Sequence, residues 1–259
     1  MPDAQFADPR LAQLYDVFDN DRSDLAVYLE IIQSFDVKRI LDIGCGTGCL
    51  ACLLSDHGFE VIGIDPAQAS LTEAKKKPQA PHIEWIHGTA ETARHHCVDL
   101  AIMTGNVAQI FLTEDEWLNT LHAIRQSLVD GGYLIFETRK PEAKAWKHWT
   151  KKNSFQTATL SSTFSTTSSE NIGEVATWCE VSNVQTINQF GGHPCKLVSF
   201  NHTYAFAKTG DTLQSHSTIC FRPQEAIETS LAAAHFEVIE VRDAPDRTGL
   251  EYVFITRAC

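Results

Sequence analysis

Short apolar runs alternate with amphipathic stretches along the N-terminal half of the chain. Five runs have the length and composition of buried strands, at residues 39–43, 60–65, 83–88, 99–103 and 133–137. Between them, apolar residues spaced three and four positions apart predict helices, most clearly at residues 49–55, 66–77 and 113–128. Strands and helices that alternate in this way predict an α/β fold, with a parallel sheet covered by helices on both faces.

The same pattern continues at both ends of the chain. Before the first strand, one or two helices are predicted by two sets of apolar residues with helical spacing: Leu11, Leu14, Tyr15 and Phe18, then Leu25, Tyr28, Leu29 and Ile32. Near the C-terminus, a helix is predicted at residues 223–235 and strands at residues 236–241 and 251–256.

The pattern changes between residues 141 and 219. Residues 153–218 are rich in Ser, Thr, Val and aromatic side chains and have turn signals at Asn171–Gly173 and Gly191–Gly192, which predicts about four antiparallel strands. We therefore expect one α/β domain at residues 1–140 and 220–259, with N-terminal helices as a cap. Residues 141–219 would form an inserted antiparallel β subdomain, either a lid or a dimerisation surface.

The junction between the first strand and the following helix carries the strongest chemical signal. The strand ends in Asp42-Ile43 and runs into Gly44-Cys45-Gly46-Thr47-Gly48. Glycines allow positive φ and close approach of a ligand, and the N–H groups of a helix start can donate to an acceptor-rich ligand. A dinucleotide fingerprint is a second interpretation, but its third glycine would fall at Cys49.

This stretch resembles motif I of the class I S-adenosylmethionine-dependent methyltransferases, whose pattern is apolar-apolar-Asp-apolar-Gly-x-Gly-x-Gly. The Gly131-Gly132 entry into an apolar strand and the terminal strand pair are similar to the same family. The resemblance covers roughly residues 35–140 and 220–259. It implies a doubly wound, seven-stranded, mostly parallel sheet with an antiparallel last strand. It also implies S-adenosyl-L-methionine as cofactor and S-adenosyl-L-homocysteine as product.

Polar residues at the predicted strand ends converge on the edge where parallel sheets bind ligands. Asp65 can accept both ribose hydroxyls there, or cap the helix that follows it. Tyr15 can touch the cofactor, as an N-terminal aromatic does in similar enzymes, or be a half-buried core tyrosine. The resemblance implies a cofactor-binding set made of Tyr15, Asp42, Gly44, Cys45, Gly46, Gly48, Asp65, Pro66, Thr89, Ala90, Glu91, Thr104, Gly105 and Asn106.

Residues just beyond the fourth and fifth strands are the candidates for substrate contact. Gln109 and Arg139 lie at the expected mouth of the site, and Arg139 could hold a substrate carboxylate or phosphate or be an exposed strand-end residue. Trp146 and Trp149 could form an aromatic wall or anchor the insert to the α/β domain.

No catalytic residue is assigned from the sequence. Methyl transfer from a sulfonium is an in-line displacement with an activated donor, so the enzyme mainly aligns the reactants and excludes water. A general base is needed only if the nucleophile is protonated. None of the 11 histidines, including His216, lies in a recognisable triad or metal spacing, and no metal is expected.

Composition narrows the class of partner. The formal charge of −12 makes nucleic acid an unlikely ligand, because that affinity depends on Lys and Arg. No signal peptide or apolar run of the roughly 18 residues that span a bilayer is found, so we expect a cytoplasmic protein without membrane contact. Cys45, Cys49 and Cys52 have the spacing of a [4Fe–4S] motif, but Ala51 replaces the usual aromatic, which favours packing roles.

The expected function is methyl transfer to an O, N or C nucleophile, most simply on a small molecule. Thr104-Gly-Asn-Val107 lacks the Asn/Asp-Pro-Pro-aromatic motif of methyltransferases that act on adenine or glutamine. Two alternatives remain open: a cofactor-binding but non-catalytic paralogue or interaction subunit, and a nicotinamide dehydrogenase. A homodimer is possible through the insert.

Overall fold

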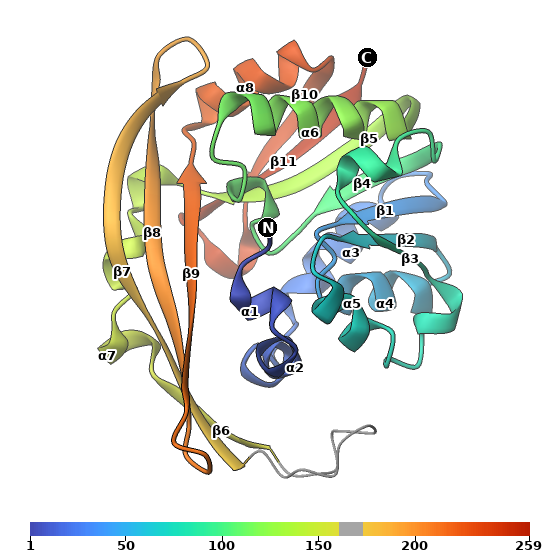
Figure 1. Ribbon diagram of the computed structural model, residues 1–259. Coiled ribbons are helices and arrows are strands. Elements are labelled where there is room, and N and C mark those ends of the chain that lie inside the picture. The colour runs from blue at the N-terminus through green and yellow to red at the C-terminus, as the bar shows by residue number, and fades with distance from the viewer. Residues whose placement is uncertain (161–172) are drawn as a thin grey trace.

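The computed structural model describes residues 1–160 and 173–259, which form an α/β body with a second sheet beside it (Figure 1). The body contains a seven-stranded sheet in the order β10-β11-β5-β4-β1-β2-β3. Strands β1 to β5 run parallel, while β11 is antiparallel to both of its neighbours. The predicted doubly wound, mostly parallel sheet is confirmed. The strands are β1 (Arg39–Ile43), β2 (Glu60–Asp65), β3 (Glu84–His87), β4 (Val98–Met103), β5 (Leu128–Arg139), β10 (Phe236–Asp243) and β11 (Glu251–Ala258).

Alternate side chains of each central strand enter two separate cores. Ile40 packs with helices α3 (Asp24–Gln33) and α4 (Cys49–Asp56), whereas Leu41 packs with α6 (Glu114–Ser127) and α8 (Gln224–Ala233). Helix α5 (Gln68–Ala74) covers β2 and β3. Because strand side chains alternate between faces, a continuous apolar run such as β1 requires helices on both faces of the sheet.

The starts of α5 and β5 differ most from the sequence prediction. Helix α5 was predicted over residues 66–77 but begins at Gln68, because the Asp65 side chain accepts the Ala67 N–H at 2.7 Å and turns the chain first. Strand β5 was predicted from Tyr133 but begins at Leu128, which pairs with Val98 before the ladder shifts. The Gly131-Gly132 pair therefore forms an irregularity within a strand and does not end the preceding helix.

The insert is a four-stranded antiparallel sheet in the order β6-β7-β8-β9, as predicted. Gly191 and Gly192, with φ of +82° and +97°, make the turn between its two longest strands. The other expected turn, Asn171–Gly173, lies largely outside the described residues. The strands are β6 (Gln156–Leu160), β7 (Gly173–Gln189), β8 (His193–Phe206) and β9 (Thr212–Phe221); short helices η4 (Pro141–Ala143), η5 (Ala145–His148) and α7 (Lys151–Ser154) precede them.

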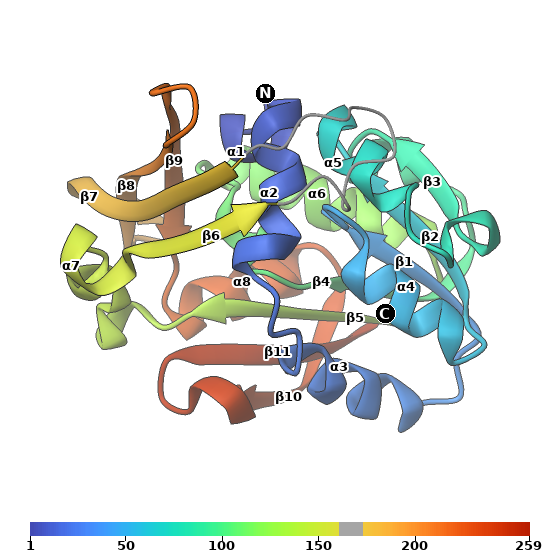
Figure 2. The same cartoon turned by 90° about the horizontal axis from the view of Figure 1, so that it is seen from below.

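The N-terminal helices α1 (Ala4–Ala7) and α2 (Pro9–Phe18) lie between the two sheets, as both views show (Figures 1 and 2). Leu11 and Leu14 of α2 pack against Val175 and Tyr204 of the insert, while α2 also contacts α5 of the body. The cap is therefore held by the insert and the body together. In the described parts of the chain, no helix is both long and apolar enough to cross a membrane.

Candidate active site

A cavity of about 790 Å³ follows the carboxyl ends of β1, β2 and β4. This edge includes the switch point between β1 and β4, where parallel sheets of this kind bind ligands. One wall comes from the body and contains most of the predicted cofactor residues: Asp42, Gly44, Cys45, Gly46, Asp65, Pro66, Thr89, Ala90, Glu91, Thr104 and Gly105. The opposite wall comes from the N-terminal helices, the loop after β4 and strand β9, and it includes Phe6, Tyr15, Ile110, Phe111, His216 and Thr218.

The three glycines of the loop have different structural roles, although all have positive φ. A Cβ on Gly44 would lie 2.5 Å from Val107, and one on Gly48 would lie 2.5 Å from Trp85, so both are needed for packing. A Cβ on Gly46 would meet no protein atom within 4 Å, because this residue faces the cavity. Gly48 does not line the cavity. Gly46 is thus the glycine whose missing side chain leaves room for a ligand.

Asp65 connects the glycine loop to the end of β2. Its Oδ2 accepts the Gly46 N–H at 2.9 Å, and its Oδ1 accepts the Ala67 N–H at 2.7 Å. Burial raises the pKa of this carboxyl, although the two N–H groups act in the opposite direction. A carboxylate has about four acceptor positions, so two remain for ligand hydroxyls. The helix-capping interpretation and the ribose interpretation of Asp65 are therefore compatible.

Asp42 is a buried acid with one unsatisfied oxygen. Burial, followed by repulsion from Asp65, raises the pKa of Asp42 to about 7. Its Oδ2 has no hydrogen-bond partner among the described residues, although the side chain lines the cavity. S-adenosylmethionine carries a sulfonium and an ammonium, either of which would favour the charged form of this acid. Asp42, Gly46 and Asp65 together fit that cofactor, which when bound supplies an activated methyl group.

A hydrogen-bonded cluster attaches the N-terminal cap to the glycine loop. The Lys77 ammonium donates to Asp16 Oδ2 and to the Thr47 carbonyl, each at 2.6 Å. The Thr47 hydroxyl donates to the other oxygen of Asp16 at 2.5 Å. The adjacent Tyr15 is half-buried and lines the cavity, and burial raises its pKa to about 12, so its hydroxyl stays protonated.

Asn106 lies behind the cavity wall and does not line it. Its backbone N–H donates to Glu137 Oε1 at 3.0 Å, and its side-chain amide donates to Glu137 and Glu251 at 3.4 and 3.3 Å. Burial and the neighbouring Glu251 raise the pKa of Glu137 to about 7, and Arg247 opposes this. Asn106 adopts φ of +62°, so this buried network holds the turn that carries Thr104 and Gly105.

The predicted substrate residues also lie outside this cavity. Gln109 is fully buried, donates to the Cys220 carbonyl at 3.3 Å and accepts from Arg139 at 3.1 Å. Arg139 further pairs with Glu251 at 3.5 Å. The Gln109 amide and the Arg139 guanidinium are held by these contacts and do not line the cavity. The structure therefore gives no support for their predicted contact with a substrate.

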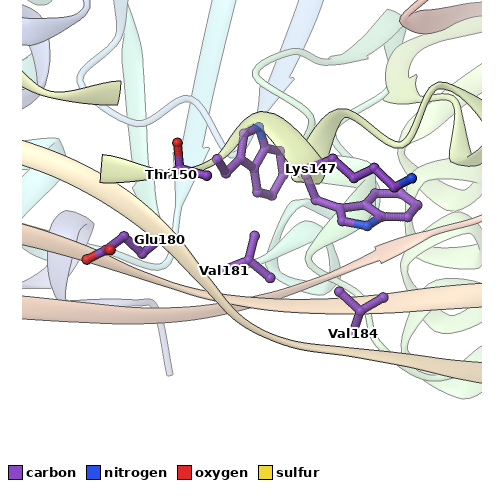
Figure 3. A pocket seen from close by; sticks show the side chains of 7 residues that line it. Lys147, Thr150, Glu180, Val181 and Val184 are labelled. Carbon is purple, nitrogen blue, oxygen red and sulfur yellow. The ribbon is translucent and has the colours of Figure 1, made fainter. Parts of the chain in front are cut away.

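Trp146 and Trp149 pack against the insert. Both rings contact Phe221 of β9, at 4.7 and 6.1 Å between centroids. They border a separate hollow of about 410 Å³ that Lys147, Glu180 and Val184 also line (Figure 3). These contacts lie within the insert, so the aromatic wall and the anchor to the α/β domain both stay predictions.

Several cavity residues were missed by sequence reasoning. Arg22 is the one Lys or Arg among the described lining residues, and Phe111 and His216 come from a loop and a strand without a motif. Arg222 holds the Phe111 loop by donating to the Phe111 carbonyl at 2.6 Å and to Gln189 of β7 at 3.0 Å. These roles depend on contacts between residues far apart in the sequence, and no local sequence pattern predicts such contacts. Among residues 1–160 and 173–259, no group of three His, Cys, Asp or Glu could hold a metal ion.

Comparison with known proteins agrees with the geometry. Residues 40–132 match the family model described as a methyltransferase domain. The chain is 30% identical over 111 residues to a ubiquinone biosynthesis O-methyltransferase of Salmonella newport (strain SL254), covering 42% of this chain and 46% of the relative. It is 33% identical over 103 residues to a protein of Geobacillus sp. (strain WCH70) named as a methyltransferase, covering 39% of this chain and 42% of the relative. The chain thus spans less than half the length of these curated relatives.

Solved structures match over nearly the whole chain. Streptomyces venezuelae DesVI gives a TM-score of 0.69 at 17% identity and covers 94% of this chain and 97% of its own. S-adenosylmethionine-bound CalS10, an amino pentose methyltransferase from Micromonospora echinaspora, gives 0.68 at 18% identity, with coverages of 95% and 97%. At such identity these matches show a shared fold.

The sheet order and the glycine loop define a Rossmann-like methyltransferase fold. Residues 40–132 are similar to a methyltransferase domain, and the chain shares the fold of solved S-adenosylmethionine-dependent methyltransferases.

Proposed function

We propose that this protein transfers the methyl group of S-adenosylmethionine to an oxygen, nitrogen or carbon nucleophile of a small molecule. The observation that carries the proposal is the continuity of the cavity. The same space is lined by strand-end residues such as Asp42 and Asp65 and by residues of the cap and insert such as Tyr15 and Thr218. In-line transfer needs donor and acceptor in one water-excluding space.

The size of the cavity supports a small acceptor. About 790 Å³ lies within the range of roughly 300–1,000 Å³ for sites of drug-sized ligands. The names of the similar proteins support the same class, since CalS10 is described as an amino pentose methyltransferase and KedS8 as a sugar N-methyltransferase. The Salmonella relative is named as an O-methyltransferase, so the names of similar proteins support both oxygen and nitrogen as the acceptor atom.

We assign the cofactor to the body wall of the cavity, with Gly46 giving room, Asp65 accepting ribose hydroxyls and Asp42 facing the cationic end. Tyr15 would cover the cofactor from the cap. The insert would act as a lid that supplies the acceptor wall, since β9 contributes His216 and Thr218. The homodimer and the cytoplasmic location stay predictions.

A labelled methyl donor and an extract of small metabolites test the proposal. We expect a labelled small molecule to form with the wild-type protein and not with Asp65→Ala. Cofactor binding without any labelled product would favour the alternative, a non-catalytic cofactor-binding paralogue. Absence of cofactor binding combined with NAD affinity would favour a dehydrogenase.

A further inference from the structure

The acceptor wall of the cavity carries an acid and an imidazole to which the assignments above give no chemical role, and two aromatic rings lie in the same wall. Asp3 precedes α1, Phe6 and Tyr15 come from the cap, and His216 comes from β9. The Phe6 and Tyr15 rings lie 5.7 Å apart. This wall belongs to elements outside the shared sheet, so its chemistry is expected to reflect the acceptor of this particular protein.

His216 is held in one orientation by the neighbouring strand. It lies opposite Asn201 in the β8–β9 ladder, and its Nδ1 lies 2.5 Å from the Asn201 side-chain oxygen. That oxygen is an acceptor, so the imidazole proton sits on Nδ1 and the lone pair is on Nε2. The next ladder pair on the same face, Ser199 and Thr218, is joined through its hydroxyls at 2.8 Å, which fixes this section of β9.

Asp3 gives the acceptor wall a negative charge. Its carboxylate makes no capping bond to α1, although the residue occupies the N-cap position. A cavity wall that contains both a carboxylate and aromatic rings is a favourable setting for an ammonium group, through charge attraction and cation–π contact. A neutral hydroxyl acceptor would not be attracted to that negative charge as an ammonium group is.

We propose that the methyl acceptor is a small-molecule amine and that His216, positioned by Asn201, is the catalytic base that removes its proton. This inference rests on the proposed function. The ammonium gives one proton to Nε2 of His216. The freed lone pair of the amine then forms the N–C bond to the methyl carbon, and the C–S bond breaks with its electron pair remaining on sulfur. His216 is exposed enough to release the proton to water.

Other charged groups contribute to the field at His216. Asp3 from the cap and Glu116 from α6 line the same cavity, as does the amino-terminal Met1, and Glu180 of β7 pairs with Asn201 in the ladder. Asp3 and Glu116 favour a cation on the acceptor wall. They therefore assist the binding of the ammonium.

The experiment is a methyl-transfer assay with labelled donor and a broad panel of small primary and secondary amines, each paired with the alcohol of the same skeleton. Examples are 2-phenylethylamine with 2-phenylethanol and glucosamine with glucose. We expect product from amines only. His216→Ala should lower kcat/KM by about 10²-fold or more at neutral pH. The loss should shrink at alkaline pH, where the amine is already deprotonated, and added imidazole should restore part of the rate.

Two controls separate this proposal from the proposed function. His122→Ala removes an exposed histidine of α6 that does not line the cavity and should keep wild-type kinetics. Titration with S-adenosylhomocysteine should give wild-type affinity for His216→Ala. Turnover of alcohols alone, turnover of no amine, or His216→Ala with a wild-type pH profile would each overturn the proposal. Loss of cofactor binding by the wild-type protein would instead contradict the proposed function.

An independent measurement addresses the role of Asn201. Nitrogen NMR of the imidazoles should find the neutral His216 ring protonated on Nδ1, and Asn201→Ala should shift it toward the Nε2 tautomer. Asn201→Ala should also lower kcat more than it raises KM, because it misorients the base without removing it. Protonation on Nε2 in the wild-type protein would exclude the proposed geometry.

Discussion

The N–H of Gly46 donates to the carboxylate of Asp65 at 2.9 Å, although the two residues lie 19 positions apart. This bond joins the loop after β1 to the end of β2, directly at the cavity wall. The acid proposed to hold the ribose thus also shapes the loop that gives the cofactor room. The proposed role of Asp65 thus makes donor binding and loop geometry depend on the same carboxylate.

Asp65→Ala should therefore lower the affinity for S-adenosylmethionine at least about tenfold, which corresponds to about 1.4 kcal/mol. The variant loses the ribose acceptor and releases the Gly46 N–H. Calorimetric titration measures the affinity, and Asp115→Ala, an exposed acid of α6, is the matched control. Equal affinities in the two variants would argue against a role for Asp65 in binding.

Glycine substitutions should divide into two kinds. Gly46→Ala adds a Cβ that meets no protein atom, so the protein should fold with a cost of about 1–2 kcal/mol for the left-handed backbone but lose cofactor affinity. Gly44→Ala places a Cβ 2.5 Å from Val107 and should lower the free energy of unfolding by more. Thermal melts and titrations of both variants check the contrast. If Gly46→Ala bound the cofactor as tightly as the wild-type protein, the cofactor could not lie in this part of the cavity.

The binding of the cofactor should depend on pH through Asp42. Because the pKa of Asp42 is about 7 in the ligand-free protein and a cationic ligand favours the carboxylate, affinity should rise with pH through neutrality. Asp42→Asn should flatten this dependence. Titrations at several pH values measure it, and an unchanged slope in the variant would assign the effect to another group.

The same shift has a consequence for stability. The pKa of Asp42 is higher in the folded protein than the usual value of 3.8, so the folded state binds the proton more tightly. This contribution to stability is present below about pH 4 and is lost as the pH rises toward 7. The free energy of unfolding of the ligand-free protein should therefore fall over this interval, and fall less in Asp42→Asn. Glu137, whose pKa is also about 7, should supply part of the remaining slope, as should Asp19 and Asp65, whose pKa values are raised by burial.

Lys77→Met should loosen the cap without unfolding the body. The change removes the 2.6 Å bonds to Asp16 and to the Thr47 carbonyl, which join α2 to the glycine loop. We expect faster dissociation of the cofactor, by about tenfold if one charge-assisted bond of about 1.5–3 kcal/mol is lost. Stopped-flow dissociation measures the rate, with the exposed Lys75→Met as control. Identical rates in the two variants would mean that the cap does not retain the ligand.

Local patterns predicted most of the body. The apolar runs of β1, β2 and β4 are buried on both faces, and the Thr113–Glu116 capping box begins α6 as expected. The insert was predictable as antiparallel strands because β-branched residues and glycine turns are local signals. The ends of α5 and β5 were not, because they depend on the Asp65 side chain and on a pairing with β4.

Individual roles in the site were harder to predict. In the sequence, Gly44, Gly46 and Gly48 are equivalent members of one motif. Only the structure shows that Gly44 and Gly48 pack against Val107 and Trp85, whereas Gly46 faces open space. Asn106 and Gln109 follow strand β4 closely but turn into the protein, toward Glu137 and Cys220. His216 lines the cavity because β9 of the insert sheet borders the cavity. No residue spacing along the chain could have predicted this position.

Calorimetric titration of the wild-type protein with S-adenosylhomocysteine tests the central claim most directly. We expect saturable binding at one site with a dissociation constant below about 100 μM, and we expect both Asp65→Ala and Gly46→Ala to weaken it. The absence of binding to S-adenosylhomocysteine and S-adenosylmethionine, with or without affinity for NAD, would contradict it.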